Sequence, residues 1–129
     1  TPFEHRSFGE ELALCQRYYF NPWLNAERRT YQVNGFRHGS GWIFSMNFPM
    51  TMRAAPTIDF GSTPDDDIGI NSTGGGVSVR PTSEFSAANI GIHGCRLTSS
   101  WSGTYSTGDP GAITNDDASG CTLNIDAEL

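Results

Sequence analysis

The chain has 129 residues and a formal net charge of −6, and all eight of its basic residues are arginine. An acidic protein repels phosphate backbones and anionic lipid, so we expect neither general nucleic-acid binding nor membrane insertion, and no apolar run approaches the length of a membrane span. Hydrophobic residues make up 36% of the chain and aromatic residues 12%, which predicts a folded core rather than disorder.

The first predicted element is a helix over residues 8–19. Ser7 and Glu10 have the spacing of a capping box, in which each side chain bonds the backbone N–H of the other residue. Within the predicted helix, apolar residues recur on one face at spacings of four, three and four. They are Phe8, Leu12, Cys15 and Tyr19. Asn21 and Pro22 would end the helix.

Short strands are predicted along the rest of the chain. Residues 31–33 read as a strand, followed by a turn at Asn34-Gly35 and a return through Phe36. Residues 42–48 alternate between apolar and polar, which is typical of a half-buried strand. Further short strands are expected at residues 57–60, 68–70, 77–79, 84–86 and 89–92.

The last third of the chain combines an expected loop with the clearest strand. Residues 98–120 are rich in Ser, Thr, Gly and Asp and read as a long exposed loop, with a strand considered only near residues 98–105. Residues 121–129 then alternate without a break. Together these elements predict one all-β domain over residues 1–129, an antiparallel, jelly-roll-like β-sandwich with one N-terminal α-helix.

Three segments of the chain form recognisable motifs. They are the opening Thr1-Pro2-Phe3-Glu4-His5-Arg6-Ser7-Phe8 running into Glu10-Glu11-Leu12-Ala13-Leu14-Cys15-Gln16-Arg17-Tyr18-Tyr19, then Phe48-Pro49-Met50-Thr51-Met52-Arg53-Ala54-Ala55-Pro56-Thr57, and Ile125-Asp126-Ala127-Glu128-Leu129. Together these segments resemble a family found at the C-terminal ends of bacteriophage tail-fibre and related virion appendage proteins, and they make up about a quarter of the chain. The resemblance implies the C-terminal part of a longer virion protein, assembled in the bacterial host cytoplasm and commonly a homotrimer. The rival hypothesis is a purely structural capsid decoration or cement domain.

Within that frame, two groups of residues are candidate binding surfaces. Loops 63–76 and 98–118 would face a host-surface glycan, with Trp101, Tyr105 and Asp109 as the candidate contacts, because sugars bind to an aromatic face flanked by polar side chains. Packing of the two aromatic residues against a satellite core is the alternative. The apolar helical face, with Phe8, Leu12, Cys15 and Tyr19, either covers the open end of its own sandwich or packs around a threefold axis.

No catalytic residues, metal site or cofactor are predicted. The runs Asp65-Asp66-Asp67 and Asp116-Asp117 lack the spacing of a calcium loop, and the three histidines lack that of a zinc site. A glycosidase needs two carboxylates that face each other across a cleft. Asp59, Glu84 and Asp126 could supply them only if two of the three converge, whereas the outward faces of strands normally carry such groups, so we expect a protein that is not an enzyme. The odd cysteine count leaves a Cys95–Cys121 bridge or buried thiols open, with Cys15 and Cys121 on apolar faces.

Overall fold

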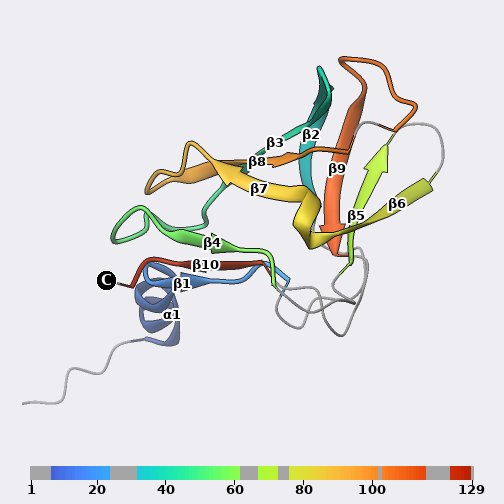
Figure 1. The fold of residues 1–129 in the computed structure, drawn as a ribbon. Coiled ribbons are helices and arrows are strands. Elements are labelled where there is room, and N and C mark those ends of the chain that lie inside the picture. Colours follow the sequence, from blue (N-terminus) through green and yellow to red (C-terminus); the bar gives the residue numbers. More distant parts are fainter. Residues whose placement is uncertain are drawn as a thin grey trace, which may run out of the picture.

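A computed structural model describes residues 7–23, 32–61, 67–72, 76–101, 103–115 and 123–128. The fold is an all-β antiparallel sandwich with one N-terminal helix, as predicted (Figure 1). A seven-stranded sheet curls over a three-stranded sheet, and the helix lies beyond the smaller sheet. Within the described residues, no helix is long and apolar enough to cross a membrane.

The smaller sheet joins three segments that lie far apart in the sequence. Its order is β1-β10-β4, with β10 in the middle and all pairs antiparallel. Its strands are β1 (Tyr19–Phe20), β4 (Thr57–Asp59) and β10 (Asn124–Asp126). The predicted alternation of the last strand is confirmed over residues 123–127, where the inward side chains are buried and the others are not. Residues 121, 122 and 129 lie outside the described residues.

The larger sheet has the order β6-β5-β9-β2-β3-β8-β7. Its strands are β2 (Gln32–His38), β3 (Gly41–Asn47), β5 (Asp67–Ser72), β6 (Gly76–Pro81), β7 (Phe85–Ala88), β8 (Gly94–Ser99) and β9 (Pro110–Asn115). A short 3-10 helix at Thr82–Glu84 leads into β7. The alternation predicted for residues 42–48 is confirmed, because Trp42, Phe44, Met46 and Phe48 are buried between polar or half-buried neighbours.

One core lies between the two sheets. Side chains of β3, β5, β8 and β9 meet those of the small sheet and of the loops beside it. Burying such aliphatic and aromatic side chains stabilises the fold by about 1.5–3 kcal/mol each. The fully buried hydrophobic members include Trp42, Phe44, Met52, Ile68, Ile70, Leu97, Ile113, Leu123 and Ile125.

The helix α1 (Phe8–Gln16) begins as predicted and ends three residues early. The capping box is confirmed, since Ser7 N donates to Glu10 Oε2 at 2.8 Å and Glu10 N donates to Ser7 Oγ at 3.3 Å. The predicted end at residue 19 is wrong, because the backbone carbonyl groups of Arg17 and Tyr18 accept hydrogen bonds from other segments of the chain. Arg53 N donates to Arg17 O, and Ala127 N donates to Tyr18 O.

The turn predicted at Asn34-Gly35 is also wrong. Both residues lie inside β2, and the hairpin to β3 turns instead at Gly39, whose φ of 54° lies in the left-handed region that favours glycine. Gly35 is needed for another reason: a Cβ there would collide with the carbonyl oxygen of Ile43 and the ring of Phe44.

Two further segments exchange their expected roles. Residues 89–92 form the loop between β7 and β8, where Asn89 has a φ of 50° and Gly91 N donates to Gly94 O, so no strand continues there. Residues 110–115, expected within a loop, form β9 between β2 and β5. Four consecutive residues of β9, Ala112 to Asn115, are buried.

Candidate functional site

The most unusual surface is that of α1. None of its nine residues is buried, and the Phe8 side chain is 83% exposed. Leu12 is 45% exposed, and Cys15 and Tyr19 are exposed as well, although Tyr19 now belongs to β1. The helix therefore does not bury its apolar face against its own sandwich. The structure places all four predicted interface residues at the surface.

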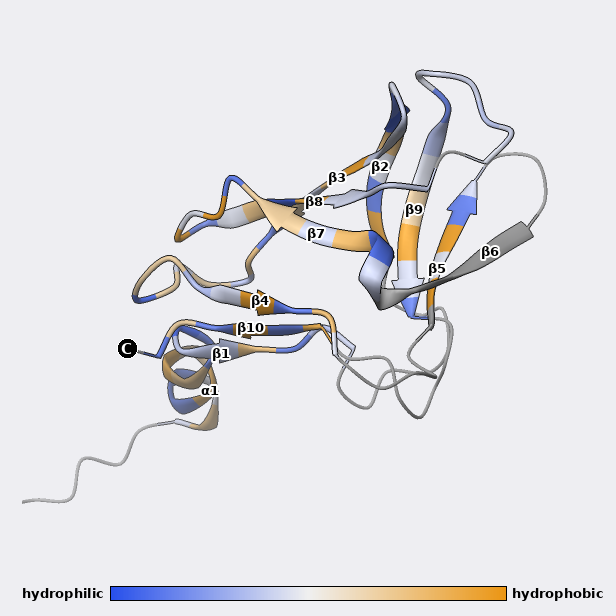
Figure 2. Cartoon of the chain, in the orientation of Figure 1, coloured by the Kyte–Doolittle hydropathy of each residue, from blue (hydrophilic) through white to orange (hydrophobic). Residues whose placement is uncertain are grey.

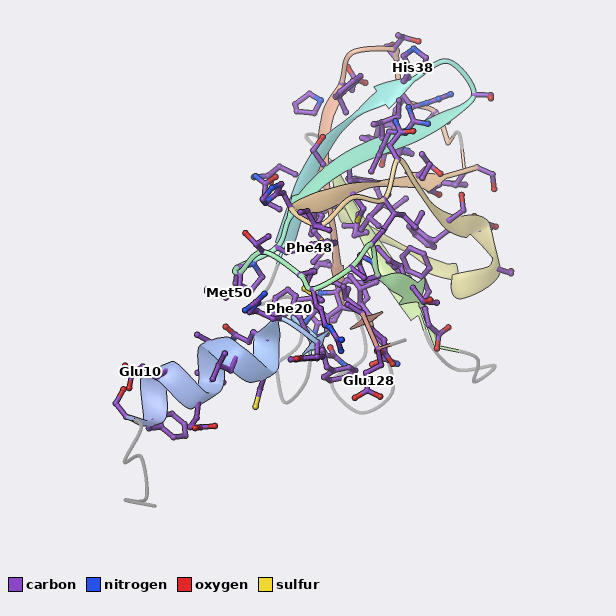
Figure 3. All side chains as sticks on the ribbon, turned by 90° about the vertical axis from the view of Figure 1, so that its left-hand side faces the viewer. Glu10, Phe20, His38, Phe48, Met50 and Glu128 are labelled. Carbon is purple, nitrogen blue, oxygen red and sulfur yellow. The ribbon has the colours of Figure 1, made fainter. Side chains whose placement is uncertain are left out.

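The C-terminal end of α1 is fixed to the sandwich by the segment after β3. Arg53 N donates to Arg17 O at 2.9 Å, and the Arg53 guanidinium lies 5.4 Å from the centre of the Tyr18 ring. Such a cation–π contact adds about 0.5–1 kcal/mol at an exposed site. The helix is thus held at its last turn, while its first turn extends from the body (Figure 3).

Trp101 and Tyr105 meet each other and the core. Their rings are 5.5 Å apart, edge to face, and the Tyr105 ring stands equally far from that of Trp42. Both residues are half-buried and pack against the core cluster. The geometry thus supports the satellite-core alternative, while part of each side chain still faces solvent. Their role as glycan contacts stays a prediction.

Asp109 has a structural task at the start of β9. Its Oδ2 accepts from Ser106 N at 2.8 Å, and its backbone oxygen accepts from Arg37 N at 2.9 Å. The carboxylate thus closes the turn before β9, in the manner of an Asx residue that bonds nearby backbone.

A polar hollow of about 400 Å³ lies on the outer face of the smaller sheet. Its side chains come from all three strands and the residues after β10, so only strand pairing brings them together. Tyr19 Oη donates to Asn124 Oδ1 at 2.7 Å, and Asn21 Nδ2 donates to the same oxygen at 3.0 Å. The lining residues are Tyr19, Thr57, Asp59, Asn124, Asp126 and Glu128.

The hollow unites two of the three carboxylates considered from the sequence. Asp59 and Asp126 both line it, whereas Glu84 belongs to the 3-10 helix beside β7. Each of these two carboxylates already accepts a hydrogen bond from a backbone N–H two residues further along the chain. Asp126 Oδ1 accepts from Glu128 N, and Asp59 Oδ1 accepts from Gly61 N. The sequence signal for this surface was the polar half of the alternation in residues 121–129, opposite its apolar half.

The two described cysteines are free thiols with opposite environments. Cys95 is buried in β8, and this burial raises the pKa of its thiol to about 11. Cys15 is exposed on α1, so the alternative of a buried thiol does not hold for Cys15. Cys121, the partner considered for Cys95, lies outside the described residues.

No group of three or more His, Cys, Asp or Glu side chains suited to a metal ion occurs within the described ranges. The side chains of Asp65, Asp66, Asp67, Asp116 and Asp117 lie outside them.

Comparison of the chain with protein-family models, with curated proteins and with solved structures finds no match.

Proposed function

We propose that this chain is the C-terminal module of a bacteriophage virion appendage of the tail-fibre or tailspike type. In this proposal it assembles as a homotrimer through α1 and binds a glycan of the host surface without hydrolysing it. The resemblance of the three motifs supports the virion assignment. The exposed apolar face of α1 is the observation that supports assembly into a homotrimer.

Helix α1 is short and depends on burial for its stability. A helix of nine residues is marginal in water on its own, because nucleation is costly and few hydrogen bonds repay it. Tertiary burial of an apolar face normally supplies the missing stability, yet α1 buries none of its residues in the single chain. Burial of Phe8 and Leu12 between copies would supply about 1.5–3 kcal/mol for each fully covered side chain.

The assembly part is tested by the mass of the protein in solution, measured by light scattering after size-exclusion chromatography. We expect three times the chain mass of 14.0 kDa, and a monomer for Phe8→Ser. The matched control is Phe36→Ser, because Phe36 is also an exposed phenylalanine (45%) but lies on β2, within ring contact of His38. Figure 3 shows His38 at the opposite end of the molecule from α1. A monomeric wild-type protein would contradict the proposal.

The virion part is tested by gold labelling of the C-terminus on intact particles. Label at the tips of fibres or spikes is the expected result. Label distributed over the capsid would instead support a decoration protein and overturn the appendage assignment.

The recognition part is tested on a glycan array with two variants that preserve packing. Tyr105→Phe keeps the ring against Trp42 and removes the hydroxyl, and Asp109→Asn keeps an oxygen for Ser106 N while removing the charge. Weaker glycan binding by both variants is expected. Asp126→Asn, in the hollow of the smaller sheet, is the comparison. Loss of binding only in that variant would show that Trp101, Tyr105 and Asp109 are not the contact residues.

A further inference from the structure

A second apolar surface lies near the attached end of α1. We call it the end patch and define it as Met50, Ile90 and Ile92, which are 37%, 36% and 39% exposed. Met50 follows β3, and the two isoleucines belong to the loop between β7 and β8. The two segments lie side by side, because Met52 N donates to Ile92 O at 2.8 Å and Phe48 N donates to His93 O at 2.9 Å. Figure 2 shows hydrophobic colour at the tip of the β7–β8 loop.

The segments that form the end patch lie within two long stretches without Asp or Glu, residues 28–58 and 85–108. Residues 48–53 and 89–93 contain Arg53 and His93, both exposed, and no carboxylate. The chain as a whole carries six more acidic than basic residues. The end patch is therefore an apolar surface with the charge of Arg53 at its edge, on an acidic protein.

Helix α1 has the complementary character. It carries Glu10 and Glu11 in its first turn and no basic residue, and its exposed apolar face begins at Phe8. An acidic helix with an apolar face matches an apolar patch edged by Arg53 in both hydrophobicity and charge sign.

The helix of the same chain does not cover the end patch. Its last turn is attached beside the patch through Arg17 and Tyr18, which contact Arg53. Its first turn lies at the other end, and Figure 3 shows Glu10 well away from Met50. To place its own Glu10 and Glu11 on the patch, the chain would have to break the contacts that hold its last turn.

We propose that the end patch is the docking site for α1 of a neighbouring copy of this chain. Each copy then gives one helix and receives another, which is a head-to-tail contact that closes into a ring in a cyclic oligomer. The inference rests on the proposed trimer and specifies its contact. It differs from an arrangement in which three helices meet only each other on the axis.

The test uses the thiol that the chain already has on α1. In an Ile90→Cys variant, mild oxidation should join Cys15 of one copy to the new cysteine of the next and give covalent dimers and trimers on a non-reducing gel. Peptide mapping should identify the Cys15 link. The bands should disappear when Cys15→Ser is added, and His38→Cys, an exposed position at the other end of the molecule, should give no Cys15 link.

The outcomes separate the two proposals. A trimer whose Cys15 thiols link only to each other would overturn docking on the end patch and leave the trimer standing. A monomer would overturn both. Charge exchange gives an independent measure: Arg53→Glu and Glu11→Arg should each weaken association, by about fivefold or more, and the double variant should recover most of the loss. If the double variant is no better than the worse single one, docking on the end patch is wrong.

Discussion

Gly35 shows how a single position can decide between two local structures. Asn-Gly is a strong hairpin signal, yet here the pair runs through the middle of β2. The missing side chain lets the strand pack tightly against β3, because a Cβ would occupy the space of the Ile43 carbonyl oxygen and the Phe44 ring. The glycine is kept for close approach rather than for a turn.

We therefore expect Gly35→Ala to lower the free energy of unfolding by about 1–3 kcal/mol, the usual cost of overpacking. Urea denaturation would measure the change. Gly9→Ala is the control, because a Cβ at Gly9 meets nothing within 4 Å and alanine favours a helix. Equal stability of Gly35→Ala and the wild type would show that the β2–β3 contact is looser than described.

At the scale of elements, α1 depends on a charge at its first turn. The backbone hydrogen bond from Ser7 and then the hydrogen bond from its side chain hold the pKa of Glu10 below its usual value. A lowered pKa in the folded state means that the carboxylate stabilises the helix above the usual pKa range of glutamate. This contribution is lost as the pH falls through the lowered pKa.

Acid should consequently unwind α1 before it affects the sheets. We expect the ¹³Cα chemical shifts of residues 8–16 to lose their helical displacement as the pH falls through the lowered pKa of Glu10, while those of β3 and β8 stay unchanged. Ser7→Ala should reduce the displacement already at pH 6 and leave less to lose on acidification. Helical shifts that persist unchanged to pH 2 would contradict a stabilising role for the capping box.

The elements also show which parts of the fold were open to prediction. Residues 42–48 and 123–127 repeat large apolar residues at every second position, so the sequence predicts both strands directly. In β9, Ile113 is the only large apolar side chain. Ile113 is buried because β9 pairs with β2 on one side and with β5 on the other, and both strands lie far from β9 in the sequence. The local sequence pattern of β9 does not reveal these partners.

Of the candidate surfaces, one can be predicted from the local sequence and two cannot. The apolar face of α1 is a helical repeat within a dozen residues and could be read from the sequence. The hollow on the smaller sheet combines Tyr19, Asp59 and Asp126, and the end patch combines Met50 with Ile90. Each depends on pairing between distant segments, so neither is visible before the fold is known.

For the whole molecule, association through α1 predicts that stability depends on protein concentration. Partners that bind only the folded state raise the apparent stability by mass action. A tenfold increase in concentration should raise the midpoint of thermal unfolding by about 2–4 °C. Phe8→Ser should remove this dependence and Phe36→Ser should keep it, as scanning calorimetry at two concentrations would show. A wild-type midpoint independent of concentration would contradict assembly of the folded chain.

The central place of β10 in the smaller sheet has a consequence for biosynthesis. Residues 124–126 separate β1 from β4, so residues 19–20 and 57–59 leave the ribosome long before the strand that joins them. A polypeptide truncated before residue 123 would expose two unpaired strand edges and lose the bond from Ala127 N to Tyr18 O beside α1. Synthesis of residues 123–127 thus controls when the residues that follow α1 are fixed in place, and a chain truncated before them cannot complete the smaller sheet.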